Sequence, residues 1–177
     1  MRPQEVTRVA VLVAIGIVLP SLFHLSGISG RVFLPMHIVP LLGGFLLERG
    51  AVAFLTGFIL PPVNFLLTGM PPFPSFVVMM FELGAYGFFV FFFSRRMRLG
   101  ILSSLILSML CGRAVSLLGN WMLFAFLGRG FNAVAFAQGL FVTALPGIAL
   151  QLLVVPLVVH ALLRRERNVT RQSSRLF

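Results

Sequence analysis

The sequence contains no lysine and no aspartate, and it has few charged residues of any kind. Only 10% of its 177 residues are charged. All 14 basic residues are arginine, and the four acids are Glu5, Glu48, Glu82 and Glu166. Without lysine the chain cannot form a Walker A phosphate loop or a Schiff base, and without aspartate it cannot form an aspartyl-phosphate or a kinase-type metal site. The chain therefore cannot hydrolyse ATP by itself.

Long hydrophobic runs take the place of the missing charge. The chain is 59% hydrophobic with a mean hydropathy of +1.05, whereas a soluble domain carries roughly a quarter charged residues. Proline, glycine and arginine divide it into six apolar runs, at about 6–26, 34–47, 51–67, 75–93, 99–127 and 138–163. Because about 20 helical residues cross a bilayer core, we predict an all-α integral membrane protein with six transmembrane helices. Residues 1–163 would form its single domain, followed by a basic cytoplasmic tail over 164–177.

The second and third apolar runs are shorter than a full span. Pro40, Pro61 and Pro62 lie in or at the ends of these runs. Short, proline-containing segments predict broken or partly re-entrant helices. Irregular backbone of this kind has to face protein or a cavity, because lipid cannot satisfy its polar groups.

The arginines indicate the orientation in the membrane. If the N-terminus is cytoplasmic, the inner side holds eleven of them: Arg2, Arg8, Arg49, Arg95, Arg96, Arg98, Arg164, Arg165, Arg167, Arg171 and Arg175. The outer side then holds only Arg31 and Arg129, so the positive-inside rule favours two cytoplasmic termini. Arginines in short gaps between apolar runs are topology signals, so no nucleic-acid partner is expected. The basic tail would lie on anionic lipid headgroups.

This orientation puts the longer loops, at about 21–33, 68–74 and 128–137, on the outer side. The second of them, from Thr68 to Pro74, contains Met70 and is stiffened by three prolines. Such loops could be lids over a binding site. They could equally be the ordinary turns that any multi-pass protein needs.

Two charged residues lie inside predicted spans. Glu82 is in the fourth span and Arg113 is near the middle of the fifth. An ionised side chain in hydrocarbon costs roughly 2.5–3.5 kcal/mol on insertion scales, so each should face the bundle interior and find a partner. The two residues could pair with each other, could bind a ligand, or could do both.

Polar and aromatic residues near this pair suggest a pocket in the outer half of the bundle. Tyr86 lies four residues after Glu82 on the same helical face, and Asn120 lies seven residues after Arg113 on its face. Apolar walls with a few orienting polar groups are typical of small-molecule sites. The candidate substrate-binding residues are His37, Asn64, Met70, Glu82, Tyr86, Arg113, Asn120, Trp121 and Gln151. For the lone amides and His37 the alternative is a helix-to-helix hydrogen bond, and for Trp121 it is an interface anchor.

The same residues do not form a catalytic or metal site. Glu82 has no second acid near it, and His24 and His37 have no cysteine or aspartate beside them. The single cysteine, Cys111, can form neither an intrachain disulfide nor a cysteine metal cluster. We expect no enzymatic activity, no bound metal and no cofactor.

The sequence resembles the substrate-binding S components of energy-coupling factor (ECF) vitamin transporters. The length, six spans and inside termini match, and the more specific similarity runs over three segments: Leu34-Pro35-Met36-His37-Ile38, Leu67-Thr68-Gly69-Met70-Pro71-Pro72 and Phe81-Glu82-Leu83-Gly84-Ala85-Tyr86-Gly87. The resemblance implies an ECF S-component-like bundle in the bacterial plasma membrane. It also implies a vitamin or vitamin precursor as ligand, bound beneath the first and second outer loops.

The resemblance also implies partners. In the family an Ala-xxx-Ala face on the first helix docks on the transmembrane coupling subunit, and Ala10 and Ala14 occupy the matching positions. The cytoplasmic ATPases of the ECF module would supply the energy. Members specific for nickel or cobalt typically begin with Met-His, whereas this chain begins Met1-Arg2, which argues against metal uptake. A buried Arg113 would suit a carboxylate vitamin such as niacin or pantothenate.

Two other classes of protein fit the same hydropathy pattern. A structural or assembly factor of six-span type, such as a cell-shape factor, would use small-residue faces for partners and have no pocket. A self-sufficient secondary carrier is less attractive, because no inverted repeat is visible between the halves.

Overall fold

The structure, a computed structural model, describes residues 2–25, 33–128 and 130–173. Over these ranges the chain is helical and contains no strand. The helices are α1 (Pro3–Leu25), α3 (Pro35–Leu46), α4 (Gly50–Thr68), α5 (Ser75–Phe91), α6 (Ile101–Phe126), α7 (Ala133–Gln138) and α8 (Leu145–Ser173). Two π-helical turns, η1 (Phe92–Arg96) and η2 (Gly139–Thr143), follow α5 and α7.

Five helical segments in the described part of the chain are long and apolar enough to cross a membrane. They are Pro3–Phe23, Gly50–Thr68, Ser75–Arg96, Ile101–Phe126 and Leu145–Leu162. The predicted second span is the 12-residue helix α3, about 18 Å long at 1.5 Å per residue and therefore too short to cross alone. The last spanning segment begins at Leu145 rather than near residue 138, because α7 and η2 form a separate short segment before it.

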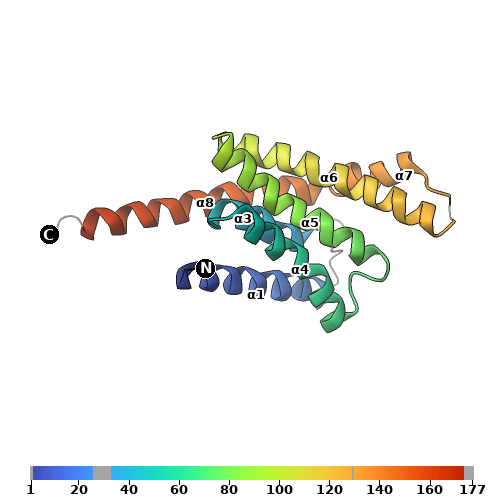
Figure 1. Cartoon of the computed structure of the whole chain (residues 1–177), viewed down its shortest axis with the longest axis horizontal. Helices are drawn as coiled ribbons and strands as arrows, with labels where there is room; N and C mark the ends of the chain where they lie inside the picture. The colour runs from blue at the N-terminus through green and yellow to red at the C-terminus, as the bar shows by residue number, and fades with distance from the viewer. Residues whose placement is uncertain (1, 26–32, 129, 174–177) are drawn as a thin grey trace.

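The helices lie along the long axis of the molecule and alternate in direction (Figure 1). Because α3 runs back between α1 and α4, the N-terminus of α1 and the C-terminal part of α8 lie at the same end. α8 continues as one helix to Ser173 and projects beyond the bundle. The polar segment after residue 163 therefore begins as a helical extension of the last span.

The short helix α3 is the centre of the bundle. All of its residues except Leu46 are buried, and it packs against α1, α4, α5 and α8. Just before it, Leu34 has a left-handed backbone (φ 49°) that a branched side chain rarely adopts. The Leu34 carbonyl accepts a hydrogen bond from Nε2 of Gln151 at 3.4 Å. α3 itself continues through Pro40 as one helix, so the break predicted in the second run is absent, and the irregular backbone is confined to Leu34, which is buried.

Two arginines hold the other end of α3. Nη1 of Arg8 donates to the Leu46 carbonyl at 2.9 Å, and Nη2 of Arg95 donates to the Phe45 carbonyl at 3.2 Å. The last carbonyls of a helix lack partners within the helix, and basic side chains satisfy them well. α3 is therefore tied to α1 and to the end of α5 at its C-terminus.

The helices α4 and α5 cross at very short range through small residues. A Cβ placed on Gly57 would collide with the backbone oxygen of Leu83, and one on Gly87 would collide with that of Ala53. Small residues allow this approach in membranes, where close packing replaces the hydrophobic effect. The spacing of Ala53 and Gly57 thus serves the protein's own bundle.

The prediction that the third run is a broken helix was wrong. α4 continues through Pro61 and Pro62 to Thr68. A proline removes one hydrogen bond and crowds the preceding turn, but neighbouring helices can hold such a segment in place. Nδ2 of Asn64 donates to the Gly16 carbonyl of α1 at 3.1 Å and to the Leu60 carbonyl at 2.9 Å. This bridge fixes the turn after the prolines against α1.

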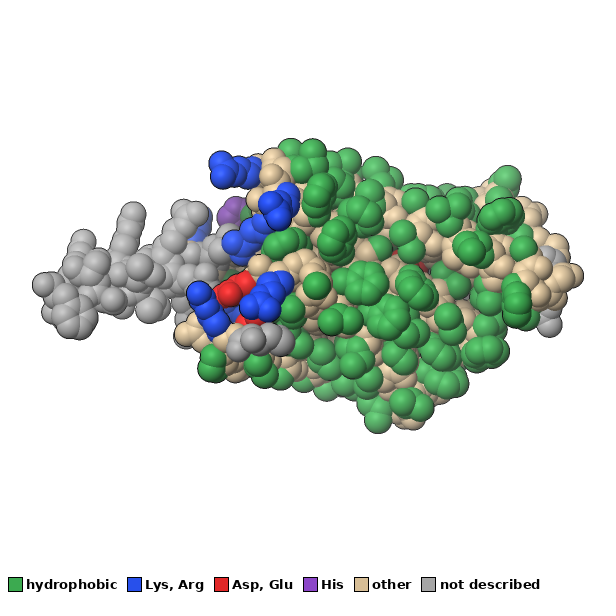
Figure 2. Space-filling view, viewed as in Figure 1, with side chains coloured by type: hydrophobic (Ala, Val, Ile, Leu, Met, Phe, Trp, Pro, Cys, Tyr) green, Lys and Arg blue, Asp and Glu red, His purple; other side chains and the backbone are tan. Residues whose placement is uncertain are grey.

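The surface is divided between an arginine-rich end and an apolar remainder (Figure 2). The arginines gather at the end where α1 begins. Nη1 of Arg2 lies 3.8 Å from Oε1 of Glu48. The apolar side chains cover the long sides of the bundle on the face shown. This distribution is typical of a multi-pass membrane protein whose arginine-rich end lies at one membrane surface.

Candidate functional site

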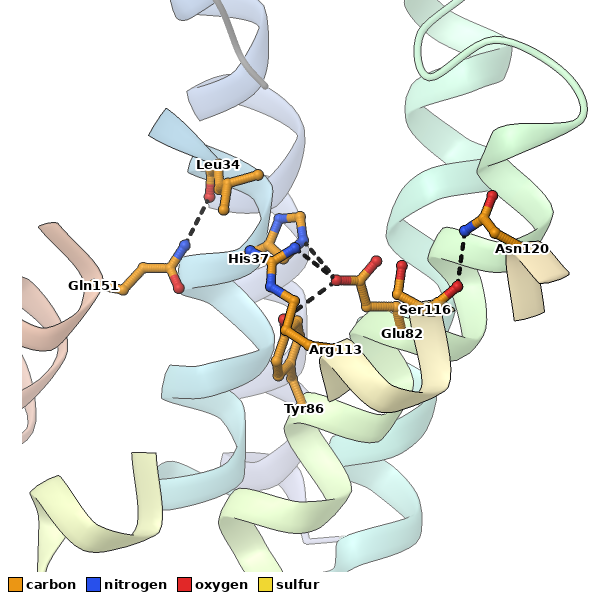
Figure 3. Close-up of polar contacts among 8 residues, drawn as sticks. All are labelled: Leu34, His37, Glu82, Tyr86, Arg113, Ser116, Asn120 and Gln151. Atoms are coloured by element: carbon orange, nitrogen blue, oxygen red, sulfur yellow. Dashed lines mark hydrogen bonds and ion pairs between the residues drawn. The ribbon is translucent and has the colours of Figure 1, made fainter. Parts of the chain in front are cut away.

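A buried polar cluster lies where α3, α5 and α6 meet (Figure 3). Glu82 of α5 is its centre. Oε1 of Glu82 accepts hydrogen bonds from Nη1 of Arg113 at 3.1 Å and from the hydroxyl of Tyr86 at 3.2 Å. Nε2 of His37 lies 3.6 Å from the same oxygen. All four side chains are buried, so the predicted pairing of Glu82 with Arg113 is confirmed.

The local sequence explains how these groups meet. Glu82 and Tyr86 are one helical turn apart on α5 and therefore project from the same face. Gly112 of α6 leaves room for the Tyr86 ring, because a Cβ there would collide with that ring. His37 meets the same ring edge-on, with ring centroids 5.5 Å apart. One aromatic ring thus fills the space between α3, α5 and α6 and holds the polar groups above it.

Several nitrogens in the cluster have no hydrogen-bond partner among the described residues. They are Nε and Nη2 of Arg113 and both ring nitrogens of His37. Arg113 carries five N–H donors in a fixed planar array, and the structure directs Nη1 toward Glu82. Leaving a buried donor without an acceptor costs about 1–3 kcal/mol, and more for a charged group. The cluster is therefore equipped to donate hydrogen bonds to a further group.

Ser116 belongs to this cluster and was not among the candidate site residues. It is buried, and Figure 3 shows it beside the Glu82 carboxylate. Ser116 lies three residues after Arg113, so helical spacing alone would have put it on the same face of α6. The three-residue spacing from Arg113 is therefore the sequence signal for Ser116.

The amide side chains of the candidate set serve mainly as ties within the bundle. Nδ2 of Asn120 donates to the Ser116 carbonyl of its own helix at 2.8 Å. The amide of Gln151 binds the Leu34 carbonyl, and that of Asn64 joins α4 to α1. All three are buried as expected. In the structure, Asn64 and Gln151 make the helix-to-helix hydrogen bonds that were the alternative to ligand contact.

The structure does not bring Met70 and Trp121 to the cluster. Met70 is 45% exposed in the loop after α4, and Trp121 is 56% exposed on α6. Trp121 follows the buried Asn120 directly, so the 100° step of a helix turns its side chain outward. An outward tryptophan near the end of a span is typical of an interface anchor.

No group of three or more His, Cys, Asp or Glu side chains that could hold a metal ion occurs in the described ranges. Glu82 is the one acid in the cluster, and Arg113 already binds it. The arrangement is suited to recognition by hydrogen bonds and charge.

A comparison with known families agrees with the geometry. The sequence profile of the family described as "ECF transporter, substrate-specific component" matches residues 4–159, which is most of the chain. The chain belongs to this family. Comparisons with curated proteins and with solved structures give no match. As an ECF S component, the protein is a membrane subunit that works with an ECF module made of a transmembrane coupling subunit and ATPases.

The residues predicted to dock this S component on its coupling subunit lie on an open face. Ala10 and Ala14 of α1 are both exposed, and Val11 and Val18 beside them are exposed as well. The opposite side of α1 is buried, with Gly16 packed against Leu60. One face of α1 thus joins the bundle, and the face with the two alanines is open to another helix.

The predicted lids are only partly described. Residues 26–32 of the first outer loop and Arg129 of the third lie outside the described residues. The second loop is described, and Met70 and Phe73 in it are exposed. The proposed role of these loops as lids stays a prediction.

Proposed function

We propose that this S component binds a small vitamin or vitamin precursor at the cluster of Glu82, Arg113, His37 and Tyr86. The observation that carries the proposal is the set of buried side-chain nitrogens on Arg113 and His37 that make no hydrogen bond. Arg113 and His37 together present four nitrogens without a hydrogen-bond partner among the described residues. These nitrogens lie inside a membrane bundle, where polar residues face the interior and mark substrate pathways.

A purely structural ion pair would be arranged differently. Burying two charges is costly, and the cost is offset only when the remaining donors and acceptors are also satisfied. Here Glu82 Oε1 receives two hydrogen bonds while Arg113 uses one nitrogen of three. Because two of the three Arg113 nitrogens make no hydrogen bond, we infer that Arg113 does more than hold α6 against α5.

The arginine-rich end supports an orientation with both termini in the cytoplasm of a bacterial cell. In this orientation the ligand enters from the outside, between the outer ends of the helices. The α1 face with Ala10 and Ala14 docks on the coupling subunit, and ATP hydrolysis by its partner ATPases drives the release of the ligand inside. Residues 1–163 form the transport domain, and the tail from residue 164 contacts the inner lipid headgroups.

The proposed substrate class rests on the two Arg113 nitrogens, Nε and Nη2, that make no hydrogen bond among the described residues. A buried guanidinium recognises planar anions with paired hydrogen bonds. Nicotinate and pantothenate are small carboxylate vitamins with such a group, and they are the first compounds to test.

The function is tested by two linked assays. The purified protein is screened for binding against a panel of water-soluble vitamins, and cells that express it with an ECF module are assayed for ATP-dependent uptake of each compound. Cells with the ATPases omitted are the control. Binding and uptake of one panel member are expected. A protein that binds no member would instead fit a structural or assembly factor of the membrane.

A further inference from the structure

The free edge of Arg113 has a defined shape. Nη1 is used by Glu82, and the two nitrogens without a partner among the described residues, Nε and Nη2, form the side edge of the guanidinium. That edge presents two parallel N–H groups, which match the two oxygens of a carboxylate. Arg113 is 4% exposed, so a ligand on this edge is held away from bulk water.

His37 lies in the same cluster, and the ring nitrogen that carries no proton accepts no hydrogen bond among the described residues. A neutral imidazole carries one N–H and one bare nitrogen, which needs a donor when it is buried. Neither ring nitrogen of His37 has a hydrogen-bond partner among the described residues, and the ring is 2% exposed. A proton on the bare nitrogen would turn it into a second donor. Both nitrogens could then bind carboxylates, with Nε2 already 3.6 Å from Oε1 of Glu82.

The charge count around His37 is simple. α5 contributes Glu82 and Tyr86, and α6 contributes Arg113. α4 has no ionisable residue, and α8 contributes the neutral amide of Gln151, which binds the carbonyl of Leu34 three residues before His37. On α1, Glu5 and Arg8 lie near the N-terminus of the helix, at the arginine-rich end of the bundle. Arg8 binds the Leu46 carbonyl at the end of α3 there. With a neutral His37 the cluster has no net charge.

A carboxylate that binds to Arg113 upsets this balance. Two carboxylates would then face one guanidinium, and the uncompensated negative charge would be costly in a water-excluded interior. One proton on His37 restores neutrality and supplies the missing donor. We infer that the S component binds its ligand as a carboxylate on the Nε–Nη2 edge of Arg113 together with one proton, which His37 accepts. This inference rests on the proposed function and deepens it.

The number of protons taken up can be measured directly. The purified protein is titrated with nicotinate and with pantothenate by calorimetry at one pH, in phosphate and in Tris buffer, whose ionisation heats differ. The neutral analogues nicotinamide and pantothenol are the matched control ligands. We expect at least one acid to bind with an uptake of about one proton, and its neutral analogue to bind at least about a hundredfold more weakly. Between about pH 6.5 and pH 8.5, where free carboxylates are ionised, the affinity should fall by up to about tenfold per pH unit.

A matched variant tests the role of His37. His37→Gln keeps an amide donor near Glu82 but cannot accept a proton. We expect it to bind the same acid more weakly and without proton uptake, whereas Trp121→Phe, on the outer surface, should behave as the wild type. If His37→Gln does not fold, the proton count of the wild-type protein still decides the question.

The outcomes separate the inference from the proposed function. Binding of an acid by the wild type without proton uptake would overturn the inference and leave the function standing. So would equal binding of the acid and its neutral analogue, proton uptake that survives in His37→Gln, or the binding of some other panel compound while both acids fail at millimolar concentration. Failure of every vitamin in the panel to bind would contradict the proposed function itself.

Discussion

Nη1 of Arg113 donates to Oε1 of Glu82 at 3.1 Å, and this ion pair links α6 to α5 in the interior of the bundle. The sequence separates the two residues by 31 positions. The ion pair allows both charges to be buried together. The Nε and Nη2 groups of Arg113 make no hydrogen bond among the described residues.

The pair should contribute to stability as well as to binding. Arg113→Ala leaves the Glu82 carboxylate buried without its cation, and we expect a loss of about 3–5 kcal/mol in the free energy of unfolding. Replacing both residues, as in Glu82→Gln with Arg113→Gln, removes both charges and should restore much of this loss. Unfolding of the three proteins in mixed detergent micelles, followed by circular dichroism, measures the difference. A single variant as stable as the wild type would show that the pair has no structural role.

Part of this site could be predicted from the sequence. Two charges in apolar runs must find partners, and Glu82 and Arg113 lie in successive predicted spans, so each was a candidate partner of the other. The four-residue spacing put Tyr86 on the face of Glu82, and the seven-residue spacing put Asn120 on the face of Arg113. The positions of Glu82, Arg113 and Tyr86 could be predicted because they depend only on helix geometry and on the cost of burying charge.

Other features could not be predicted, because they depend on contacts distant in the sequence. The short apolar run over 34–47 gives no sign that α3 is the central helix, and His37 reaches Glu82 only because α3 packs on α5. Pro61 and Pro62 suggested a break, yet α4 is continuous through them, and Asn64 ties the following turn to α1. Trp121 was a candidate binding residue, but it points in a different direction from its neighbour Asn120, because adjacent helical residues are 100° apart.

The crossing of α4 and α5 should tolerate no added side chain at its closest point. Gly57→Ala places a methyl group against the backbone of Leu83, which cannot move aside as a side chain can. We expect a loss of about 1–3 kcal/mol in the free energy of unfolding. Gly139→Ala is the matched control, because a Cβ there has open space around it. Equal stability of the two variants would argue against the close crossing.

The hydroxyl of Tyr86 should contribute modestly to the free energy of unfolding. Tyr86→Phe removes the hydrogen bond to Glu82 at 3.2 Å but keeps the ring that packs against Gly112. Hydrogen bonds within membrane bundles contribute about 0.6 kcal/mol on average and up to about 1.7, and a loss in that range is expected. Thermal unfolding of the detergent-solubilised variant measures it. A much larger loss would mean that the hydroxyl organises the whole cluster.

The open face of α1 should matter for transport and not for ligand binding. Ala14→Leu fills the small-residue surface proposed to dock on the coupling subunit, and we expect uptake to be lost while vitamin binding and stability stay at wild-type levels. Ala114→Leu makes the same change at an exposed position of α6 and should leave uptake unchanged. Loss of binding in the Ala14 variant, or equal loss of uptake in both, would refute this division of roles.

The most direct test of the ligand site is native mass spectrometry of the purified protein, released from detergent with its bound small molecule. We expect a vitamin-sized adduct on the wild-type chain and on Ala14→Leu, and no adduct on Arg113→Gln. An adduct retained by a folded Arg113→Gln protein, or no adduct on any of the three after incubation with the vitamin panel, would contradict this expectation.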